Sequence, residues 1–408
     1  MKLPFLSVCI ITKNEEKFID GCISSILSIA DEIVIVDSFS TDNTKQISKK
    51  FPVTYFERKW NGDYSAARNY AISKASGKWI LFLDADERLT NGLTLISTLK
   101  KTTSDKIGGF LLERKDIYRH KDNSKITHYN VGIVRLFRNK PNIRFKYKIH
   151  EQINASILEN GYKIGIEKKA RIVHLVADSE DSFLSKKQGY YLKLLNNSLR
   201  KEPNEPWLNY QKAKTLWYFN KLDESKNLFL SIAKNQFNPI DIRTSSYNQA
   251  AVILGILKKY ELAFVELEKS IILIKGQSLA HSVYYNLYYD TNQFEKAIDS
   301  IKKVKTNIDK CKWQSIIPGD LYVNKDIKYY KIGLCHLAEN NINKAKYNFT
   351  KGVHFNSQSS DNYFGLAVLE AYRDNIKKAK QHIKKCIQFN PNWKEALELK
   401  NLLYRTNT

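Results

Sequence analysis

The stretch "WILFLDADER", residues Trp79 to Arg88, decides how the first half of the chain is interpreted. Six of its first seven residues, up to Ala85, are apolar, as in a strand that is buried on both faces. The run then ends in Asp84 and Asp86, with another acid and a base directly behind them. Paired acids at the end of a buried strand predict a polar site at that edge of a sheet.

Similar strand-like runs alternate with helix-like segments throughout the first half of the chain. Strands are expected at residues 6–12, 32–38, 53–59 and 79–85, and helices at residues 14–30, 40–51 and 63–75. This alternation predicts an α/β fold with parallel strands joined by helical crossovers. Ligands of such sheets bind at the carboxyl ends of the strands.

Composition and cysteine usage limit the class of protein. The chain has 408 residues and a net charge of +24, and 43% of its residues are hydrophobic, which suits two folded domains. The five cysteines are odd in number and lack C-x-x-C spacing, so neither a disulfide framework nor a zinc site is indicated. A reducing compartment is therefore expected.

Little in the sequence indicates a membrane-spanning or a nucleic-acid-binding protein. The chain starts with no signal-peptide pattern, and no stretch reaches the ~18 apolar residues of a membrane span. We therefore expect a cytoplasmic protein, with peripheral membrane contact left open. Lysines are spread over the whole length, so no nucleic-acid partner is predicted. They make either a solvated surface or a basic face for phosphates or acidic lipid headgroups.

The second half consists of short helices separated by polar breaks. A small residue follows each break, and Ala263 and Ala297 are 34 residues apart, as are Ala345 and Ala379. This spacing is typical of tetratricopeptide repeats, and four to five units are expected, the first of them starting near Ser225. The step of 48 residues from Ala297 to Ala345 indicates an insertion around residues 307–324. An unrelated helical bundle is the alternative.

Five pieces of the first half, in this order and spacing, resemble one known family. They are "SVCIITKNEE", "EIVIVDSFSTDNT", "WNGDYSAARN", "LFLDADE" and "RFKYKIHEQI", and they cover the chain from Leu6 to about His174. The chain resembles the family 2 glycosyltransferases, which are inverting enzymes with a GT-A fold that use nucleotide-sugars. The expected architecture is a GT-A catalytic domain at residues 1–184 followed by a tetratricopeptide-repeat domain at residues 185–408.

The family resemblance gives the paired acids a specific expected role. A nucleotide-sugar leaves as a charged diphosphate, and a divalent metal such as Mg²⁺ or Mn²⁺ with oxygen ligands neutralises that charge. The resemblance implies that Asp84 and Asp86 are the DXD motif, with Asp86 as the direct metal ligand and Asp84 nearer the ribose or the same ion. His174 would complete the metal or diphosphate site. The alternatives are solvated loop acids and a core histidine.

Further residues follow the other strands or start helices at the same edge. The resemblance implies that Asp37 binds the base of uridine, and Arg68 is suited to bidentate phosphate contacts, unless it is a surface residue. The residues expected to bind the donor are Thr12, Asn14, Glu15, Asp37, Asp63, Arg68, Asn69 and Asp84.

The last piece supplies the expected catalytic base. Alternation in residues 144–149 predicts a strand with Phe145, Tyr147 and Ile149 on one side, ending at His150 and Glu151. An inverting transfer needs a base for the acceptor's proton. We expect Glu151 to be that base, with His150 orienting it or contacting the donor phosphate. A structural His–Glu pair is the alternative.

Together these features predict a metal-dependent transferase. It would move a sugar, from a UDP-sugar by resemblance, to a peptide or protein side chain or to an envelope glycan or glycolipid. The Q-x-x-R-W motif of processive synthases is absent, so the addition of one or very few sugars is expected. The repeats would hold the acceptor or dimerise the enzyme. The alternative is a catalytically weak domain that serves as a repeat-based binding scaffold.

Overall fold

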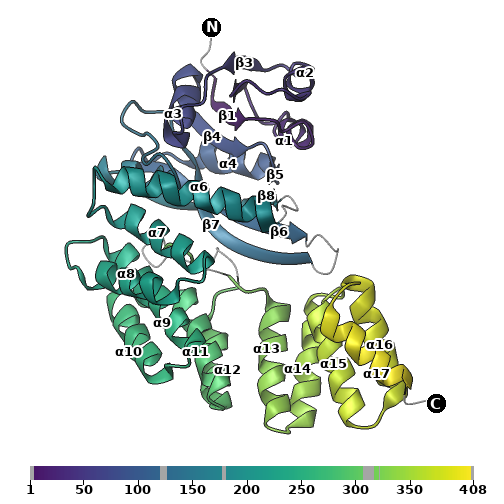
Figure 1. Ribbon diagram of the computed structural model, residues 1–408. Helices are drawn as coiled ribbons and strands as arrows, with labels where there is room; N and C mark the ends of the chain where they lie inside the picture. The colour runs from purple at the N-terminus through teal and green to yellow at the C-terminus, as the bar shows by residue number, and fades with distance from the viewer. Residues whose placement is uncertain (1–3, 120–125, 177–180, 307–316, 321, 406–408) are drawn as a thin grey trace.

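The computed structural model describes residues 4–119, 126–176, 181–306, 317–320 and 322–405, in an α/β domain followed by an array of helices (Figure 1). This confirms the predicted fold class. The predicted domain boundary at residues 184 and 185 falls inside a helix, α6, and stays a prediction.

The α/β domain is built on one mixed sheet of eight strands in the order β3-β2-β1-β4-β7-β6-β8-β5. The first four strands in this order are parallel, as predicted, and β7 joins β4 in the antiparallel sense. The strands are β1 (Leu6–Thr12), β2 (Glu32–Asp37), β3 (Thr54–Glu57), β4 (Trp79–Asp84), β5 (Glu87–Thr90), β6 (Ile107–Arg119), β7 (Ile126–Arg138) and β8 (Lys163–Val176).

Apolar side chains cover both faces of this sheet, because successive residues of a strand point to opposite sides. Val8 and Ile10 belong to the core beneath one face, whereas Cys9 belongs to the core on the other. This explains why the β1 run is apolar without alternation. The helices of the domain are α1 (Ile19–Ser24), α2 (Thr44–Ser48), α3 (Tyr64–Lys74), α4 (Gly92–Lys101) and α5 (Asn154–Glu159).

The expected strand at residues 144–149 is not formed, and that prediction was wrong. Asn69 of α3 donates to the Phe145 carbonyl and accepts from the Phe145 amide, so a side chain takes the place of a neighbouring strand. Lys146 and Gln152 then pair across a tight turn in which Tyr147 and His150 adopt positive φ. The alternation still marks two buried side chains, since Phe145 and Ile149 are buried.

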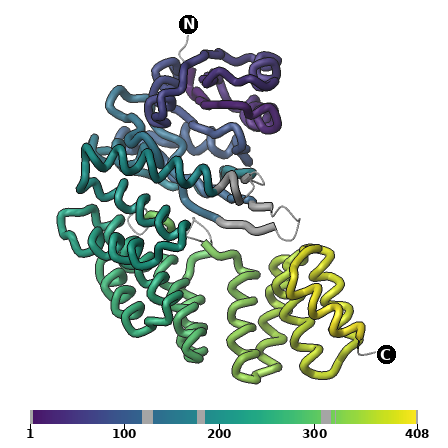
Figure 2. The backbone as a smooth tube through the Cα atoms, in the orientation of Figure 1, coloured from purple at the N-terminus to yellow at the C-terminus, as the bar shows by residue number. Residues whose placement is uncertain are grey.

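The helical part starts with α6, which lies against the sheet domain, and continues as pairs of antiparallel helices that curve away from it (Figure 2). In the described residues, five pairs run from α7 to α16, followed by α17. The helices are α6 (Asp181–Leu199), α7 (Pro206–Tyr218), α8 (Leu222–Lys234), α9 (Ile240–Ile256), α10 (Tyr260–Leu273), α11 (Ser278–Asp290), α12 (Phe294–Lys303), α13 (Lys325–Ala338), α14 (Ile342–Phe355), α15 (Ser360–Tyr372), α16 (Ile376–Phe389) and α17 (Lys394–Arg405).

The small residues that set the repeat period are fully buried where the two helices of each pair meet. A residue with positive φ ends the turn five positions before each of them, at Asn220, Lys258, Asn292, Asn340 and Asp374. The small side chain permits close helix packing, and the left-handed residue reverses the chain. The tetratricopeptide-repeat prediction is therefore confirmed, and the small residues are Ser225, Ala263, Ala297, Ala345 and Ala379.

The insertion between α12 and α13 returns to the sheet domain. Residues 307–316 and 321 lie outside the described residues, but 317–320 and 322–324, here called the strap, are placed. Tyr322 is buried in the core of the sheet domain, and its amide donates to the Asn130 carbonyl of β7. Ile317 packs in the core of α9 to α11, and Asp320 accepts from the Leu279 amide at the start of α11. The strap therefore joins the repeats to the sheet.

Candidate active site

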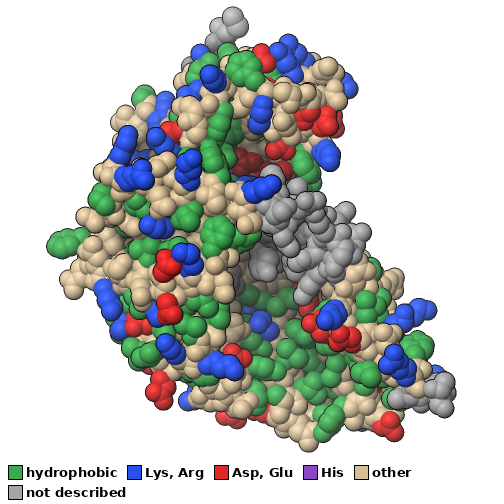
Figure 3. All heavy atoms as spheres, in the orientation of Figure 1, with side chains coloured by type: hydrophobic (Ala, Val, Ile, Leu, Met, Phe, Trp, Pro, Cys, Tyr) green, Lys and Arg blue, Asp and Glu red, His purple; other side chains and the backbone are tan. Residues whose placement is uncertain are grey.

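A cavity of about 1040 Å³ lies between the carboxyl ends of the parallel strands and the first helices of the array. A hollow with acidic side chains at its base is visible in the upper half of Figure 3. Residues of the sheet domain line one wall, among them Thr12, Glu15, Arg68, Asp84, Asp86, Arg114, Arg135, Glu151 and His174. The opposite wall comes from the helices and the strap, including Lys187, Tyr191, Trp207, Gln211, Lys214, Asp241 and Gly319.

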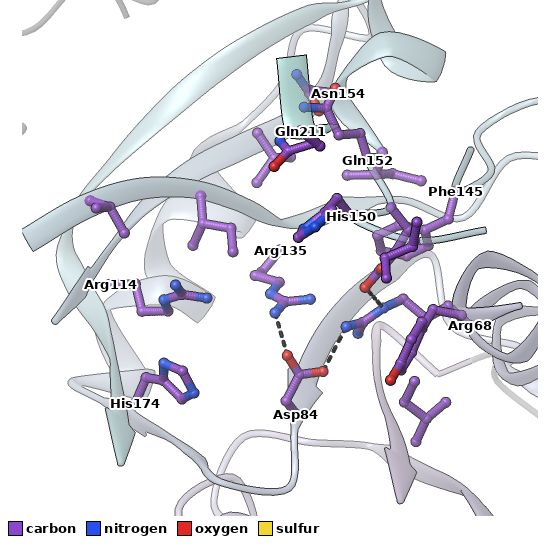
Figure 4. Close-up of a pocket in the computed structure, with 18 of the residues that line it drawn as sticks. Arg68, Asp84, Arg114, Arg135, Phe145, His150, Gln152, Asn154, His174 and Gln211 are labelled. Carbon is purple, nitrogen blue, oxygen red and sulfur yellow. Dashed lines mark hydrogen bonds and ion pairs between the residues drawn. The ribbon is translucent and has the colours of Figure 1, made fainter. Parts of the chain in front are cut away.

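Asp84 sits at the end of β4 between two arginines (Figure 4). Its two carboxylate oxygens accept from Arg68 at 2.8 Å and from Arg135 at 2.5 Å. Burial alone would raise the pKa of Asp84, but Arg135 and then Arg68 outweigh it and hold that pKa well below its usual range. Asp84 is therefore ionised, and each of its oxygens is engaged by an arginine; its role as a metal ligand stays a prediction.

Asp86 points to His174 of β8 instead. Its Oδ2 lies 3.2 Å from His174 Nε2, while His174 Nδ1 lies 2.9 Å from Asp116 Oδ1 on β6. Burial would lower the pKa of His174, but the hydrogen bonds that its ring donates to Asp116 and Asp86 raise it to about 9. The histidine is thus a cation held between two carboxylates at neutral pH.

Arg68 connects Asp84 to Glu151 through the inside of the site. Its Nε donates to Glu151 Oε1 at 2.6 Å, and its guanidinium lies over the rings of Phe82 and Phe145. The side chain is buried, so the alternative of a surface arginine is wrong. Two of its three nitrogens are already used by carboxylates, so a bidentate phosphate contact would have to displace one of them.

His150 and Glu151 are neighbours in sequence but face different partners. No hydrogen bond joins the His150 ring to Glu151 in the part of the chain that the structure describes. The His150 backbone has φ +52°, its carbonyl accepts from Trp207 Nε1 at 2.8 Å, and its ring contacts Tyr191. Burial, and then Lys214 and Lys187, lower the pKa of His150 to about 4, so the ring is neutral.

The predicted donor residues of the first two strands divide into two groups. Thr12 and Glu15 line the cavity. Burial, and then the charges of Asp86, Asp42 and Asp84, raise the pKa of Glu15 to about 7. Asn14 and Asp37 instead organise the loop after β2, where Asn14 Oδ1 accepts from the Thr41 amide and Asp37 accepts from the Ser40 amide and hydroxyl.

Two further predicted residues have structural partners. Asp63 caps α3 by accepting from the Ala66 amide, and Asn69 holds the backbone of Phe145. Both contacts fix the position of Arg68, which lies between them on α3. A direct contact of Asp63 or Asn69 with a donor stays a prediction.

Buried charges that were not predicted from the sequence surround the predicted residues. Arg114 pairs with Asp116 at 2.7 Å and with Glu87 at 3.4 Å, and Arg135 also reaches Glu87 at 3.3 Å. The signal was present, because charged residues inside long apolar strands must find partners when they are buried. The helical wall was missed for another reason, since nothing in the repeat pattern indicates that α7 and the strap return to the sheet.

The residues present fit a divalent metal only in part. In the described ranges, no group of three or more His, Cys, Asp and Glu side chains is arranged to hold an ion. Asp86 and His174 supply one carboxylate and one imidazole, a donor set that suits Mn²⁺ better than Mg²⁺. An ion held by these two side chains would need further oxygen ligands, which the diphosphate of a donor can supply.

The sheet domain and longer stretches of the chain are similar to known proteins. Residues 7–162 match the model of the family "Glycosyl transferase family 2". A TPR repeat-containing protein of Synechococcus elongatus is 33% identical over 38% of this chain and 36% of its own length. The prophage-derived glycosyltransferase SunS of Bacillus subtilis is 29% identical over 50% of this chain and 48% of its own. The lipopolysaccharide core biosynthesis glycosyltransferase LpsC of Rhizobium meliloti is 33% identical over 37% and 57%, respectively.

The chain thus spans roughly a third to three fifths of the length of these relatives. Eight solved structures that resemble parts of the chain have TM-scores of 0.34 to 0.41 and identities of 12% to 17%, and they cover 43% to 72% of it. Likeness at this level carries no conclusion about function. Among the described residues, no helix combines the length and the apolar character that crossing a membrane requires.

Proposed function

We propose that this chain, whose residues 7–162 form a glycosyl transferase family 2 domain, transfers a sugar from a nucleoside diphosphate donor to an acceptor with inversion. The observation that supports it most is the network of Asp84, Arg68 and Glu151 at the carboxyl end of β4. The network brings a fixed carboxylate, a buried cation and a candidate base together in one cavity.

Glu151 is the base in this proposal. Its Oε1 accepts from Arg68, whereas its Oε2 has no partner in the described part of the chain, and the side chain is 13% exposed. One oxygen therefore fixes the carboxylate while the other is available to take the proton of an acceptor hydroxyl or thiol. An inverting displacement requires this proton acceptor on the face of the sugar opposite the leaving diphosphate.

Asp86 and His174 are the side chains that would hold a divalent ion, which would neutralise charge on the leaving diphosphate. His174 must lose its proton before it can act as a ligand. Arg135 and Arg114, which carry positive charge beside these residues, pair with the carboxylates of Asp84 and Glu87 and hold them in place. UDP is the donor nucleotide that the family resemblance favours.

The acceptor is a peptide or protein side chain, or an envelope glycan or glycolipid. The repeats favour a protein partner, since stacked helical pairs present an extended surface. The name of the Rhizobium relative favours a glycan or glycolipid instead. We assign the reaction to the cytoplasm, because the four described cysteines are free and buried.

Donor hydrolysis tests the proposal directly. The full-length chain is incubated with UDP-, GDP- and dTDP-sugars in the presence of Mg²⁺, Mn²⁺ or chelator, and nucleotide release is measured. Asp86→Ala should reduce turnover at least about 10²-fold, as does the loss of other groups that stabilise charge in a transition state. Asp105→Ala is the matched control, because Asp105 is an acid that is 96% exposed and lies outside the cavity.

Two outcomes would contradict the proposal. Undiminished turnover in excess chelator would exclude the metal, although not the transfer itself. Binding of a nucleotide without turnover of any donor would favour the second candidate, a catalytically weak domain that presents the repeats as a binding scaffold.

A further inference from the structure

Three polar side chains stand where the main cavity opens into a smaller one of about 370 Å³. His150, Gln211 and Lys214 line both cavities, whereas Asp84, Asp86 and Glu15 line only the larger one. His150 follows the turn after Phe145, and the other two lie on α7, three residues apart and therefore on one face of the helix. In Figure 4, Arg135 lies between Asp84 and the pair formed by His150 and Gln211.

The cations of the main cavity differ in whether the protein already neutralises them. Its three arginines are paired with carboxylates. Lys13 donates to the Phe39 carbonyl, and Lys187 lies over the ring of Tyr191. Lys214 has no carboxylate, carbonyl or ring partner in the ranges that the structure covers, and Asp241, an acid on the same wall, forms no ion pair with it.

The side chains of Gln211 and His150, which lie beside Lys214, also have no hydrogen-bond partner among the described residues. Gln211 is 5% exposed, and its side-chain amide makes no hydrogen bond with any described residue. The His150 ring has none either, and it is neutral. Gln211 is buried, His150 is half-buried and Lys214 is exposed, and all three line both cavities, so polar groups that the described protein leaves unpaired converge where a ligand can reach them. A lysine ammonium and a glutamine amide are both donors, and together they suit an anion.

We propose that His150, Gln211 and Lys214 form a subsite for an anionic group, a phosphate or a carboxylate, on the acceptor. That the occupant belongs to the acceptor rests on the proposed function. The donor side of the cavity carries Glu15, Asp84 and Asp86, which oppose a second anion there, whereas this subsite adjoins Glu151, the proposed base. An acceptor whose anion binds here would present its nucleophile to that base.

Calorimetric titration of the full-length chain tests the subsite. The protein is first saturated with UDP so that the donor site is occupied, and inorganic phosphate or acetate is then added. Lys214→Met should weaken phosphate or acetate binding about 10- to 100-fold, the usual contribution of a hydrogen bond from a charged group. Lys214→Arg should restore part of it. Lys212→Met, on the same helix but outside both cavities, should have no effect.

The two anions distinguish a phosphate-bearing acceptor from a carboxylate-bearing one by which of them binds more tightly. Unchanged affinity in Lys214→Met, with UDP affinity and thermal midpoint also unchanged, would overturn the subsite, as would a wild-type chain that binds neither anion. If the chain binds no UDP, the donor proposal fails. The comparison of wild type with Lys214→Met without UDP then still tests the subsite.

Discussion

The two walls of the cavity treat their charges in opposite ways. On the sheet wall, Arg68, Arg114 and Arg135 are each locked to carboxylates within 3.5 Å. On the helical wall, Lys214 and the buried amide of Gln211 have no partner among the described residues. The arginines of the sheet wall are neutralised without a substrate, although Arg68 Nη1 and Arg135 Nε have no hydrogen-bond partner among the described residues, whereas the helical wall carries a lysine without a counter-charge.

This difference separates two tasks. Charges that must act on a fixed reaction gain from being held rigidly, because no reorganisation is then needed when charge develops. Charges that recognise a partner must stay available until the partner arrives. The sheet wall therefore suits the chemistry and the helical wall suits recognition, so substitutions on the two walls should have different effects.

The largest effect is expected from Arg135→Met on the sheet wall. This change removes the arginine shared by the half-buried Asp84 and the buried Glu87; Arg68 and Arg114 remain as partners, so the loss should lie at the lower end of the about 3–5 kcal/mol that breaking a buried pair costs. Urea unfolding of the full-length protein measures it. If Arg135→Met were as stable as the wild type, the ion pairs would not stabilise the sheet wall, and the contrast between the two walls would be wrong.

Next in size is Glu151→Gln, which removes the proposed base but keeps an oxygen for Arg68. Transfer to a hydroxyl acceptor should fall about 10²- to 10⁴-fold, while UDP affinity stays within a few-fold. A thiol acceptor should soften the loss, because part of it is already thiolate at neutral pH. Single-turnover transfer and UDP titration measure the two quantities, and an equal loss in both would make Glu151 structural.

A smaller effect concerns pH and the neutral His150. Its pKa is about 4 in the folded chain, below the ordinary 6.5, so the unfolded chain binds the extra proton as pH falls through this window. Stability attributable to His150 is therefore present above pH 6.5 and is lost toward pH 4, by at most about 2 kcal/mol at pH 5.

Measuring unfolding free energies at pH 7 and pH 5 for wild type and His150→Gln isolates this contribution. The variant should lose less stability than the wild type over that range. Added inorganic phosphate should reduce the loss in the wild type, because a bound anion favours the protonated ring. An identical loss in both proteins would mean that His150 is not the titrating group.

The smallest expected effect is that of Lys214→Met on stability, within about 0.5 kcal/mol of the wild type. No described partner is left unpaired when its ammonium is removed, in contrast to Arg135→Met. Thermal unfolding in the absence of anions checks this. A destabilisation comparable to that of Arg135→Met would show that Lys214 has an internal role and would remove the contrast between the walls.

Much of the fold could be predicted from the sequence, because it follows from local patterns. The β1 and β4 runs are apolar since both faces of the sheet are covered, and the buried residues Ala263 and Ala345 mark the helix pairs by their period. Residues 144–149 were misjudged because their alternation reflects burial of Phe145 and Ile149 alone. Their backbone is bonded to the Asn69 side chain, a contact 76 residues away that no local pattern encodes.

The candidate site was only half predictable for the same reason. Residues at the ends of strands, such as Asp84 and Asp86, could be placed from the topology of parallel sheets. Their partners could not, because Arg135 and His174 come from strands whose register is set by the antiparallel half of the sheet. The position of Lys214 depends on how the repeats dock onto the sheet domain, which the repeat period does not specify.

The strap limits how far the two halves of this protein can be treated as exchangeable modules. A chain cut near Leu199 would keep every proposed donor residue but would lose Tyr322 from the core of the sheet domain. It would also lose Gly319 and Lys214 from the cavity wall. Grafting repeats from another protein of this architecture would therefore import a new helical cavity wall and a new piece of the sheet-domain core together. Exchange of the helical wall then requires moving the insertion between α12 and α13 with the helices that it crosses.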